Sequence, residues 1–220
     1  MTGDDSFTPA LGKSEWTGLY DVAIAVMTRE GRWRKALADQ CAPGAGEKIL
    51  DVGCGTGTLA VLLKRRAPKA NLIGLDPDAD ILERARRKAA KSRVDVEFRQ
   101  GFAHDAGAIG EASVDKVVSS LVFHQTPMEE KRLGISAIHR VLRPSGEFHL
   151  ADYGLQRTPL MRRLFRQVQR LDGFENTEPN AQGVLPQLMR EAGFIDVREA
   201  RVIATPTGSI SLYFARKAER

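Results

Sequence analysis

The sequence has little cysteine and no long apolar run. Its 220 residues include 2 cysteines, Cys41 and Cys54, which give neither a disulfide framework nor the ligand spacing of a metal site. No apolar run approaches the roughly 18 residues that a membrane-spanning helix needs. The first residues, MTGDDSFTPALGKS, are polar and acidic and do not resemble a signal peptide. These absences lead us to expect a cytoplasmic protein without a bound metal.

Aromatic residues are also few, at 6 %, although the chain carries a formal net charge of +5. A basic chain raises the hypothesis of nucleic-acid binding. However, the basic residues gather at Lys64–Arg66 and Arg84–Arg93, late in two predicted helices, where cations favour the negative end of the helix dipole. No aromatic residues interleave with them to stack on bases. We therefore expect solvated helix faces and no nucleic-acid partner.

The length and the even composition predict a single domain with a sizeable core. Hydrophobic residues make up 42 % and charged residues 28 %, as in ordinary globular chains. We expect a flexible N-terminus at residues 1–14 and one domain at 15–220. Its parts are a helical lid at 15–41, a cofactor-binding core at 47–154, an acceptor-side helix at 157–172, and a final helix and hairpin at 181–217.

Short apolar strands alternate with helical stretches, which is typical of a parallel sheet covered by helices on both faces. Prolines at 77, 127 and 144 are predicted to start or break helices. The predicted strands are Lys48–Val52, Leu72–Asp76, Asp95–Gln100, Lys116–Ser120, Glu147–Asp152, Ile195–Ala204 and Ser209–Arg216. The predicted helices are Thr58–Arg66, Ala79–Lys91, Met128–Val141, Leu160–Leu171 and Gln187–Ala192.

The most informative segment is ILDVGCGTG, residues 49–57, in which an apolar strand leads into three glycines and then a helix. Glycines let the backbone approach a ligand that a Cβ atom would block. The spacing differs from the dinucleotide fingerprint G-x-G-x-x-G, because Thr58 stands at the third glycine position. Asp51 would repel a pyrophosphate but suits a ligand with an ammonium group, and S-adenosylmethionine carries such a group and no phosphate.

A second acid supports this interpretation. Asp76 ends the next strand, nineteen residues after Gly57. Acids at a spacing of about 20 residues bind the ribose hydroxyls of a cofactor.

With these residues the sequence resembles the class I S-adenosylmethionine-dependent methyltransferases. The segments ILDVGCGTG, IGLDPD, VDKVVSSLVFHQ, RVLRPSGEFHLAD and LMREAGF carry the resemblance, which covers roughly Tyr20 to Lys217. Within that superfamily the sequence is most similar to the branch of the ubiquinone and menaquinone C-methyltransferases. The resemblance implies an α/β fold with a Rossmann-like, doubly wound, seven-stranded sheet that is mostly parallel and has an antiparallel last strand.

The resemblance also implies positions for the cofactor. Asp51 and the glycine loop would hold the methionyl part, and Asp76 the ribose. The cofactor-binding residues expected in this way are Asp51, Gly53, Cys54, Gly55, Gly57, Asp76, Pro77, Ala103, Ser120 and Leu121. The related pattern has an acid directly after Gly101, where this chain has Phe102. Either Phe102 packs against adenine or a core neighbour, or Asp105 contacts the adenine amine, and Asp105 is favoured.

Candidates for acceptor chemistry are His124, Tyr153 and Tyr20. His124 follows an apolar strand end and could act as a base, hydrogen-bond a substrate oxygen, or only shape the pocket. Tyr153 ends a predicted strand. Tyr20 belongs to the amphipathic segment Trp16–Ala38, which could pack on the sheet's helices or form a lid over the cofactor.

The helix Leu160–Leu171 has an apolar stripe beside Arg162, Arg166 and Arg170, which recur every four residues. These arginines could form a solvated face, gather an acidic substrate, or give peripheral contact with a membrane surface.

The leading hypothesis is methyl transfer from S-adenosylmethionine to a small, lipophilic or aromatic acceptor. An Asn-Pro-Pro-aromatic tetrapeptide is missing where the chain reads Ser119-Ser120-Leu121-Val122, which argues against amino methylation of DNA bases or protein amides. Alternatives are a membrane-associated phospholipid-headgroup N-methyltransferase, a non-catalytic S-adenosylmethionine-binding regulatory protein, and an oxidoreductase. The sequence leaves the oligomeric state open.

Overall fold

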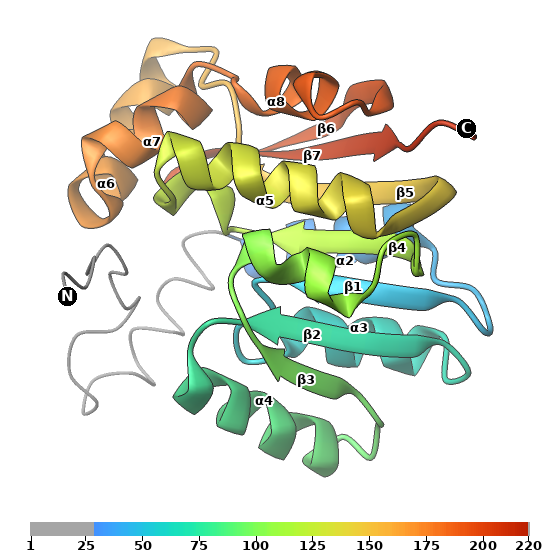
Figure 1. Ribbon diagram of the computed structural model, residues 1–220. Helices are drawn as coiled ribbons and strands as arrows, with labels where there is room; N and C mark the ends of the chain where they lie inside the picture. The colour runs from blue at the N-terminus through green and yellow to red at the C-terminus, as the bar shows by residue number, and fades with distance from the viewer. Residues whose placement is uncertain (1–28, 220) are drawn as a thin grey trace, which may run out of the picture.

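The computed structural model describes residues 29–219, which form one seven-stranded sheet with helices on both faces (Figure 1). The strand order is β3-β2-β1-β4-β5-β7-β6. Neighbouring strands run parallel except that β7 is antiparallel to both β5 and β6. The predicted Rossmann-like sheet with an antiparallel last strand is confirmed. The strands are β1 (Lys48–Val52), β2 (Asn71–Asp76), β3 (Glu97–Gln100), β4 (Val114–Ser120), β5 (Leu142–Tyr153), β6 (Ile195–Thr205) and β7 (Gly208–Arg216).

Helices cover the two faces around separate clusters of buried apolar side chains. In Figure 1, α2 and α3 lie behind the sheet and α5 lies in front of it. Two helices, α6 and α7, lie beyond the carboxyl end of β5. The helices are α2 (Glu30–Cys41), α3 (Thr58–Arg66), α4 (Ala79–Lys91), α5 (Met128–Val141), α6 (Pro159–Asp172), α7 (Phe174–Ala181) and α8 (Leu185–Glu191), with 3₁₀ turns η1 (Ala103–Ile109) and η2 (Phe123–Gln125).

Local sequence explains where several helices begin. The side chain of Asp78 accepts hydrogen bonds from the backbone N–H groups of Asp80 and Ile81, at 2.9 and 3.1 Å, and so caps α4. Thr158 caps α6 in the same way through Met161, at 3.1 Å, and proline follows at the first helical position. Helix α4 begins at the predicted Ala79, and α6 begins at Pro159, one residue before the predicted Leu160.

The strand register aligns the carboxyl ends of the central strands. Val52 at the end of β1 pairs with Leu75 in β2 and with Ser119 in β4. The strand order reverses between β1 and β4, and open α/β sheets bind ligands at such a switch point. The residues that follow β1, β2 and β4 therefore meet at one edge of the sheet.

Strand β5 and helix α7 differ most from the sequence-based prediction, since the other predicted strands and helices are shifted at their ends by at most two residues. Strand β5 begins at Leu142, earlier than the predicted Glu147, because Leu142 pairs with Val114 across an irregularity in β4. Pro144 thus lies in a strand rather than at a helix boundary. Helix α7 was not predicted because its sequence, FENTEPNA, contains weak helix formers and a proline. Tertiary contacts hold it, including a hydrogen bond of 3.0 Å from Asn180 Nδ2 to the carbonyl of Tyr153.

Three predictions concern residues beyond the described range. The N-terminus at 1–14, Tyr20 and most of the lid segment lie outside the described residues, so they stay predictions. None of the helices between residues 29 and 219 combines the length and the apolar character needed to cross a bilayer.

Candidate functional site

The glycine loop between β1 and α3 has a backbone that other residues could hardly adopt. Gly53, Gly55 and Gly57 have φ angles of 67°, 52° and 74°, all in the left-handed region. A Cβ atom on Gly53 would lie 2.1 Å from Cγ2 of Val122, whereas one on Gly55 would meet nothing within 4 Å. Gly53 is therefore needed for internal packing, while Gly55 presents bare backbone to open space that a ligand can approach.

Asp76 connects the end of β2 to this loop. Its Oδ2 atom accepts a hydrogen bond of 2.9 Å from the N–H of Gly55, and Oδ1 accepts one of 3.1 Å from Asp78. Burial raises the pKa of Asp76. Each oxygen keeps further lone-pair capacity, since an ionised carboxylate offers about four acceptor sites. The side chain is thus oriented at the loop and can still receive a pair of ligand hydroxyls.

Asp51 is the most unusual group at this edge of the sheet. It is fully buried, and within residues 29–219 neither carboxylate oxygen forms a hydrogen bond of good geometry, although a weaker contact with the backbone N–H of Ala60 lowers its pKa. Burial raises its pKa to about 7, against the opposing charge of Arg34. Leaving such a group buried and unpaired costs free energy. A ligand that carries an ammonium group would remove this cost, so Asp51 fits the expected cofactor.

Cys54 lies inside the loop and is buried beside Gly74. Burial raises the pKa of its thiol, so the thiolate is disfavoured. This agrees with the interpretation of Cys54 as a small packed residue whose backbone borders the ligand.

The residues expected around adenine follow β2 and β3. The carbonyl of Pro77 accepts a hydrogen bond of 3.0 Å from Gln100, and Ala103 begins η1, half-buried against α5. Asp105 caps η1, with Oδ2 accepting from the N–H of Phe102 at 2.9 Å. Phe102 is 42 % exposed, and its ring stacks on His104 with 5.4 Å between the centroids. Phe102 therefore does not pack into the core, and the contact between Asp105 and adenine stays a prediction.

The chain leaves β4 through a strained residue. Ser120 ends the strand, and Leu121 has a φ of 56°, which is uncommon for a residue with a side chain. The N–H of Leu121 donates to the carbonyl of Ala151 at 2.9 Å. Such strain recurs at ligand sites. Both residues lie at the carboxyl edge expected for the cofactor's sulfonium side.

His124 is held between two carboxylates. Its Nδ1 atom lies 2.8 Å from Asp152 Oδ1, and its Nε2 atom lies 3.4 Å from Asp172 Oδ2. Burial alone would lower the pKa of His124, but the charges and hydrogen bonds of both aspartates raise it to about 9. The raised pKa favours the protonated imidazolium at neutral pH. His124 would have to lose a proton before acting as a base, so that role stays a prediction.

Tyr153 follows Asp152 at the end of β5. Its hydroxyl lies 2.8 Å from Oγ1 of Thr207 in the turn between β6 and β7, and its ring meets that of His124 edge-on. Burial raises its pKa to about 12. Tyr153 is thus a neutral group whose hydroxyl already has a partner, and its contact with an acceptor stays a prediction.

Lys131 was missed because it looks like a surface residue in the first turns of α5. It is fully buried and donates to three backbone carbonyls: that of Phe123, that of Thr126 at 2.5 Å and that of Asn176 at 2.9 Å. Burial lowers its pKa to about 8. Lys131 therefore ties the segment that carries His124 to α7. Nothing in its sequence neighbourhood indicated this.

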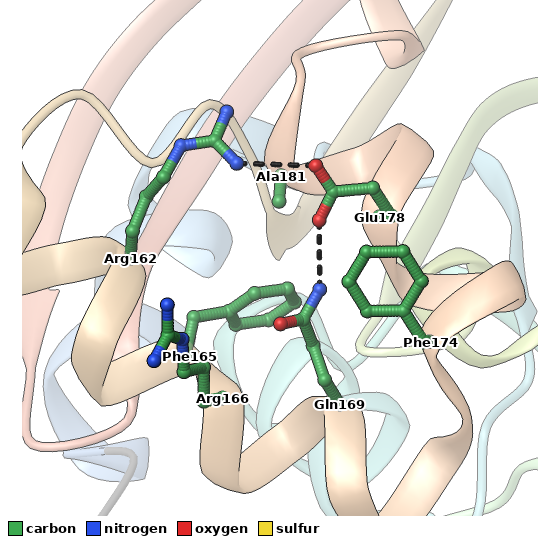
Figure 2. A pocket seen from close by; sticks show the side chains of 7 residues that line it. All are labelled: Arg162, Phe165, Arg166, Gln169, Phe174, Glu178 and Ala181. Carbon is green, nitrogen blue, oxygen red and sulfur yellow. Dashed lines mark hydrogen bonds and ion pairs between the residues drawn. The ribbon is translucent and has the colours of Figure 1, made fainter.

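Helices α6 and α7 line a partly open cavity of about 180 Å³. Figure 2 shows Glu178 at its rim, where one carboxylate oxygen lies 3.1 Å from Arg162 and the other 2.8 Å from Gln169. Of the predicted arginine row, Arg162 is thus ion-paired, while Arg166 lines the cavity and Arg170 is exposed. The residues lining the cavity are Arg162, Phe165, Arg166, Gln169, Phe174, Glu178 and Ala181.

Comparisons with known proteins agree with this arrangement. A family model described as a methyltransferase domain matches residues 49–146. The demethylmenaquinone methyltransferase of Thermus thermophilus is 36 % identical over 124 residues, which cover 56 % of this chain and 54 % of that protein. The ubiquinone/menaquinone biosynthesis C-methyltransferase of Desulfotalea psychrophila is 25 % identical over 224 residues, covering 91 % and 86 %.

A solved structure described as an O-methyltransferase family protein from Burkholderia thailandensis superposes with a TM-score of 0.68. It is 18 % identical and covers 90 % of this chain and 59 % of that chain, so the likeness shows the fold. The chain spans about half the length of the demethylmenaquinone methyltransferases that it matches.

Proposed function

We propose that this chain transfers a methyl group from S-adenosylmethionine to a small, lipophilic or aromatic acceptor. The premise is that residues 49–146 belong to the methyltransferase-domain family. The observation that carries the proposal is Asp51, a buried carboxylate that has no strong hydrogen bond within residues 29–219, at the end of the strand that leads into the half-buried glycine loop. When bound, S-adenosylmethionine supplies an electrophilic methyl group on a sulfonium. A phosphate-bearing cofactor would instead be repelled by Asp51.

In this proposal, different residues at the carboxyl edge of the sheet bind different parts of the cofactor. Asp51 accepts from the ammonium group and Asp76 from the ribose hydroxyls, while the glycine loop lets the ligand lie against the backbone. Pro77, Ala103 and Asp105 border adenine, and Ser120 and Leu121 border the sulfonium. In-line transfer requires mainly that the reacting atoms be held collinear and near about 3 to 3.5 Å apart. A rigid, mostly apolar site satisfies that requirement.

The names of the two relatives support a quinone-like acceptor, because they refer to demethylmenaquinone and to ubiquinone and menaquinone biosynthesis. His124 and Tyr153 lie on the acceptor side of the site in this proposal. The contact of His124 with Asp172 is long, at 3.4 Å. The imidazolium could therefore donate to an acceptor oxygen instead, which would favour a phenol or quinol.

Binding and turnover test separate parts of the proposal. Calorimetry should show S-adenosylmethionine binding to the wild-type chain and stronger binding of this ligand than of nicotinamide dinucleotides. Incubation with a panel of phenols, quinols and amines should then give a methylated product. Binding without any product would favour the non-catalytic regulatory protein, and preference for a nicotinamide cofactor would favour an oxidoreductase.

A membrane-linked acceptor is favoured by one surface, which we call the α6–α7 surface and define by Arg163, Arg166, Arg170, Leu160, Leu171 and Phe174. All six side chains are exposed, and the three apolar ones are 59 %, 68 % and 61 % exposed. Within residues 29–219 these three arginines form no ion pair. Exposed apolar side chains beside cations suit an anionic bilayer surface, where lipophilic acceptors are found.

Vesicle sedimentation tests this contact. Vesicles that contain phosphatidylserine should retain the wild-type chain at low salt and release it at high salt. The triple substitution Arg163→Gln, Arg166→Gln, Arg170→Gln should abolish retention. A matched control, Arg65→Gln, Arg87→Gln, Lys91→Gln, removes the same charge from exposed positions on α3 and α4. Equal loss in both variants would indicate a general charge effect and argue against the α6–α7 surface.

A further inference from the structure

The cavity between α6 and α7, which we call the α6–α7 cavity, has no role in the proposed binding of the cofactor. Four of the side chains that line it come from α6 and three from α7, so two helix faces meet across the space (Figure 2). Within residues 29–219, none of these side chains belongs to the edge of the sheet where β1, β2 and β4 end. The cavity is therefore a candidate site for a second ligand.

The polar groups of the α6–α7 cavity include a cation that no neighbour neutralises. The carboxylate of Glu178 accepts from Arg162 at 3.1 Å and from Gln169 at 2.8 Å. Gln182 also donates to it, at 3.0 Å, so Glu178 is fully engaged. Arg166 lines the same space, and within residues 29–219 it forms neither an ion pair nor a hydrogen bond. The cavity therefore presents a guanidinium that an anionic ligand can bind.

Two phenyl rings form the apolar part of the cavity. Phe165 is buried and packs on Tyr153, with 5.0 Å between the ring centroids, so its position is fixed. Phe174 is 61 % exposed although it lines the cavity. A flat apolar ligand in the cavity would remove part of the Phe174 ring from water. An aromatic ligand adds the favourable stacked or edge-on contact between rings.

The size of the cavity restricts the ligand further. Its volume is about 180 Å³, whereas sites for drug-sized ligands span about 300 to 1,000 Å³. A space of this size suits one six-membered ring with a small polar substituent. A carboxylate is the matching substituent, because its two oxygens accept parallel hydrogen bonds from a guanidinium.

We propose that the α6–α7 cavity is a second ligand site for a single-ring aromatic carboxylate, which pairs with Arg166 and packs its ring against Phe165 and Phe174. Binding at this site requires no S-adenosylmethionine. The inference therefore goes beyond the proposed function and does not depend on it.

The second site is connected to His124 in two ways. The ring of Tyr153 packs on Phe165 and also meets the ring of His124 edge-on, at 5.0 Å between centroids. Helix α6 ends at Asp172, whose carboxylate lies 3.4 Å from Nε2 of His124. A ligand that contacts both α6 and α7 favours one arrangement of these helices, so its binding is coupled to the surroundings of His124.

A nuclear magnetic resonance titration of the full chain with three probes tests the site. Benzoate carries both the ring and the charge, benzyl alcohol only the ring, and acetate only the charge. Benzoate should shift amide resonances of α6 and α7, together with the ring resonances of His124, and all shifts should saturate with one affinity. That affinity should be at least about tenfold higher than for benzyl alcohol or acetate. S-adenosylmethionine and vesicles are left out, so the result does not depend on the proposed function.

Three variants at exposed positions assign the contacts. Arg166→Gln should weaken benzoate binding about tenfold and change benzyl alcohol binding by less than about twofold. Phe174→Ala should weaken the binding of both. Arg163→Gln, the matched control, removes the same charge from a residue of α6 that does not line the cavity, and it should change neither affinity.

Two kinds of result would overturn the proposal. Equal benzoate affinity in Arg166→Gln and Arg163→Gln, or shifts that never saturate, would show that the cavity is not a specific site. Saturable binding that leaves the His124 resonances unchanged would overturn the coupling to the acceptor side.

Discussion

The imidazole Nδ1 of His124 lies 2.8 Å from Oδ1 of Asp152, and this buried pair joins the end of β5 to the segment that follows β4. Asp152 also accepts backbone hydrogen bonds from Phe123, at 2.7 Å, and from Tyr153, at 2.8 Å. On the other side of the ring, Asp172 belongs to α6. One histidine thus connects the core sheet with the helices of the acceptor side.

This pair predicts a pH dependence of stability. The pKa of His124 is about 9 in the folded chain, above its ordinary value of 6.5. Its stabilising ion pairs are complete below about pH 6.5 and are lost as the pH rises through about 9. The total loss is on the order of 3 kcal/mol. Urea unfolding of the wild type and of His124→Gln, compared from pH 6.5 to 8, should show the wild-type advantage shrinking.

Lys131 has the opposite pH dependence above about pH 8, but it is present in both proteins and so cancels in their difference. Its pKa is lowered to about 8, so the folded chain holds fewer protons there than the unfolded chain. A constant difference between wild type and His124→Gln from pH 6.5 to 8 would contradict the raised pKa of His124.

The buried charge of Asp51 should destabilise the folded chain when no ligand is bound. Its pKa is raised to about 7, so stability is lost as the pH rises from the ordinary value of 3.8 through 7. Asp51→Asn should therefore be more stable than the wild type at pH 8, by on the order of a few kcal/mol, and closer to it at pH 5. The same variant should lose stabilisation by added S-adenosylmethionine. Urea unfolding with and without ligand measures both effects, and a less stable variant at pH 8 would refute them.

Alanine substitutions at Gly53 and Gly55 should separate an effect on internal packing from an effect on ligand binding. Gly53→Ala places its Cβ 2.1 Å from Val122 and should destabilise the fold by about 2 kcal/mol or more. Gly55→Ala meets nothing within 4 Å and should cost only the backbone strain of about 1 to 2 kcal/mol. We nevertheless expect Gly55→Ala to reduce cofactor affinity at least tenfold, because its methyl group enters the ligand space. Thermal melts and calorimetry check this, and unchanged affinity would place the ligand elsewhere.

Lys131→Met should destabilise the chain by roughly 3 kcal/mol, because it leaves the carbonyls of Phe123, Thr126 and Asn176 without their shared donor. The neighbouring Arg132→Met removes an exposed ion pair with Glu191 and should cost less than about 1 kcal/mol. Hydrogen exchange should show faster exchange in α7 and the segment after β4 for Lys131→Met alone. Similar profiles for both variants would argue against this role.

Much of the fold could be predicted because its signals are local. The bounds of β1, α3, α4 and α5 match the sequence-based prediction, since apolar runs, glycine at 57 and the cap at Asp78 all act within a few residues. Helix α7 could not be predicted in this way. Its stability comes from partners far along the chain, such as the carbonyl of Tyr153 for Asn180.

The residues of the candidate site also differ in whether local sequence signals indicate them. The glycine loop and Asp76 follow motifs with fixed spacing, so the sequence indicated both. The pairing of His124 with Asp152 and Asp172 joins residues 28 and 48 positions away, which no local pattern reveals. Lys131 looks like an ordinary helix-surface cation in the sequence, and only the packing of α5 against α7 and the segment after β4 buries it.

The most direct test of the account is a calorimetric titration of S-adenosylmethionine into the wild-type chain and into Asp76→Asn, with Asp80→Asn on exposed α4 surface as the control. We expect binding to the wild type, an affinity at least about tenfold lower for Asp76→Asn because a charged acceptor of the ribose hydroxyls is lost, and no change for the control. Absence of binding to the wild type, or equal affinity in all three proteins, would contradict it.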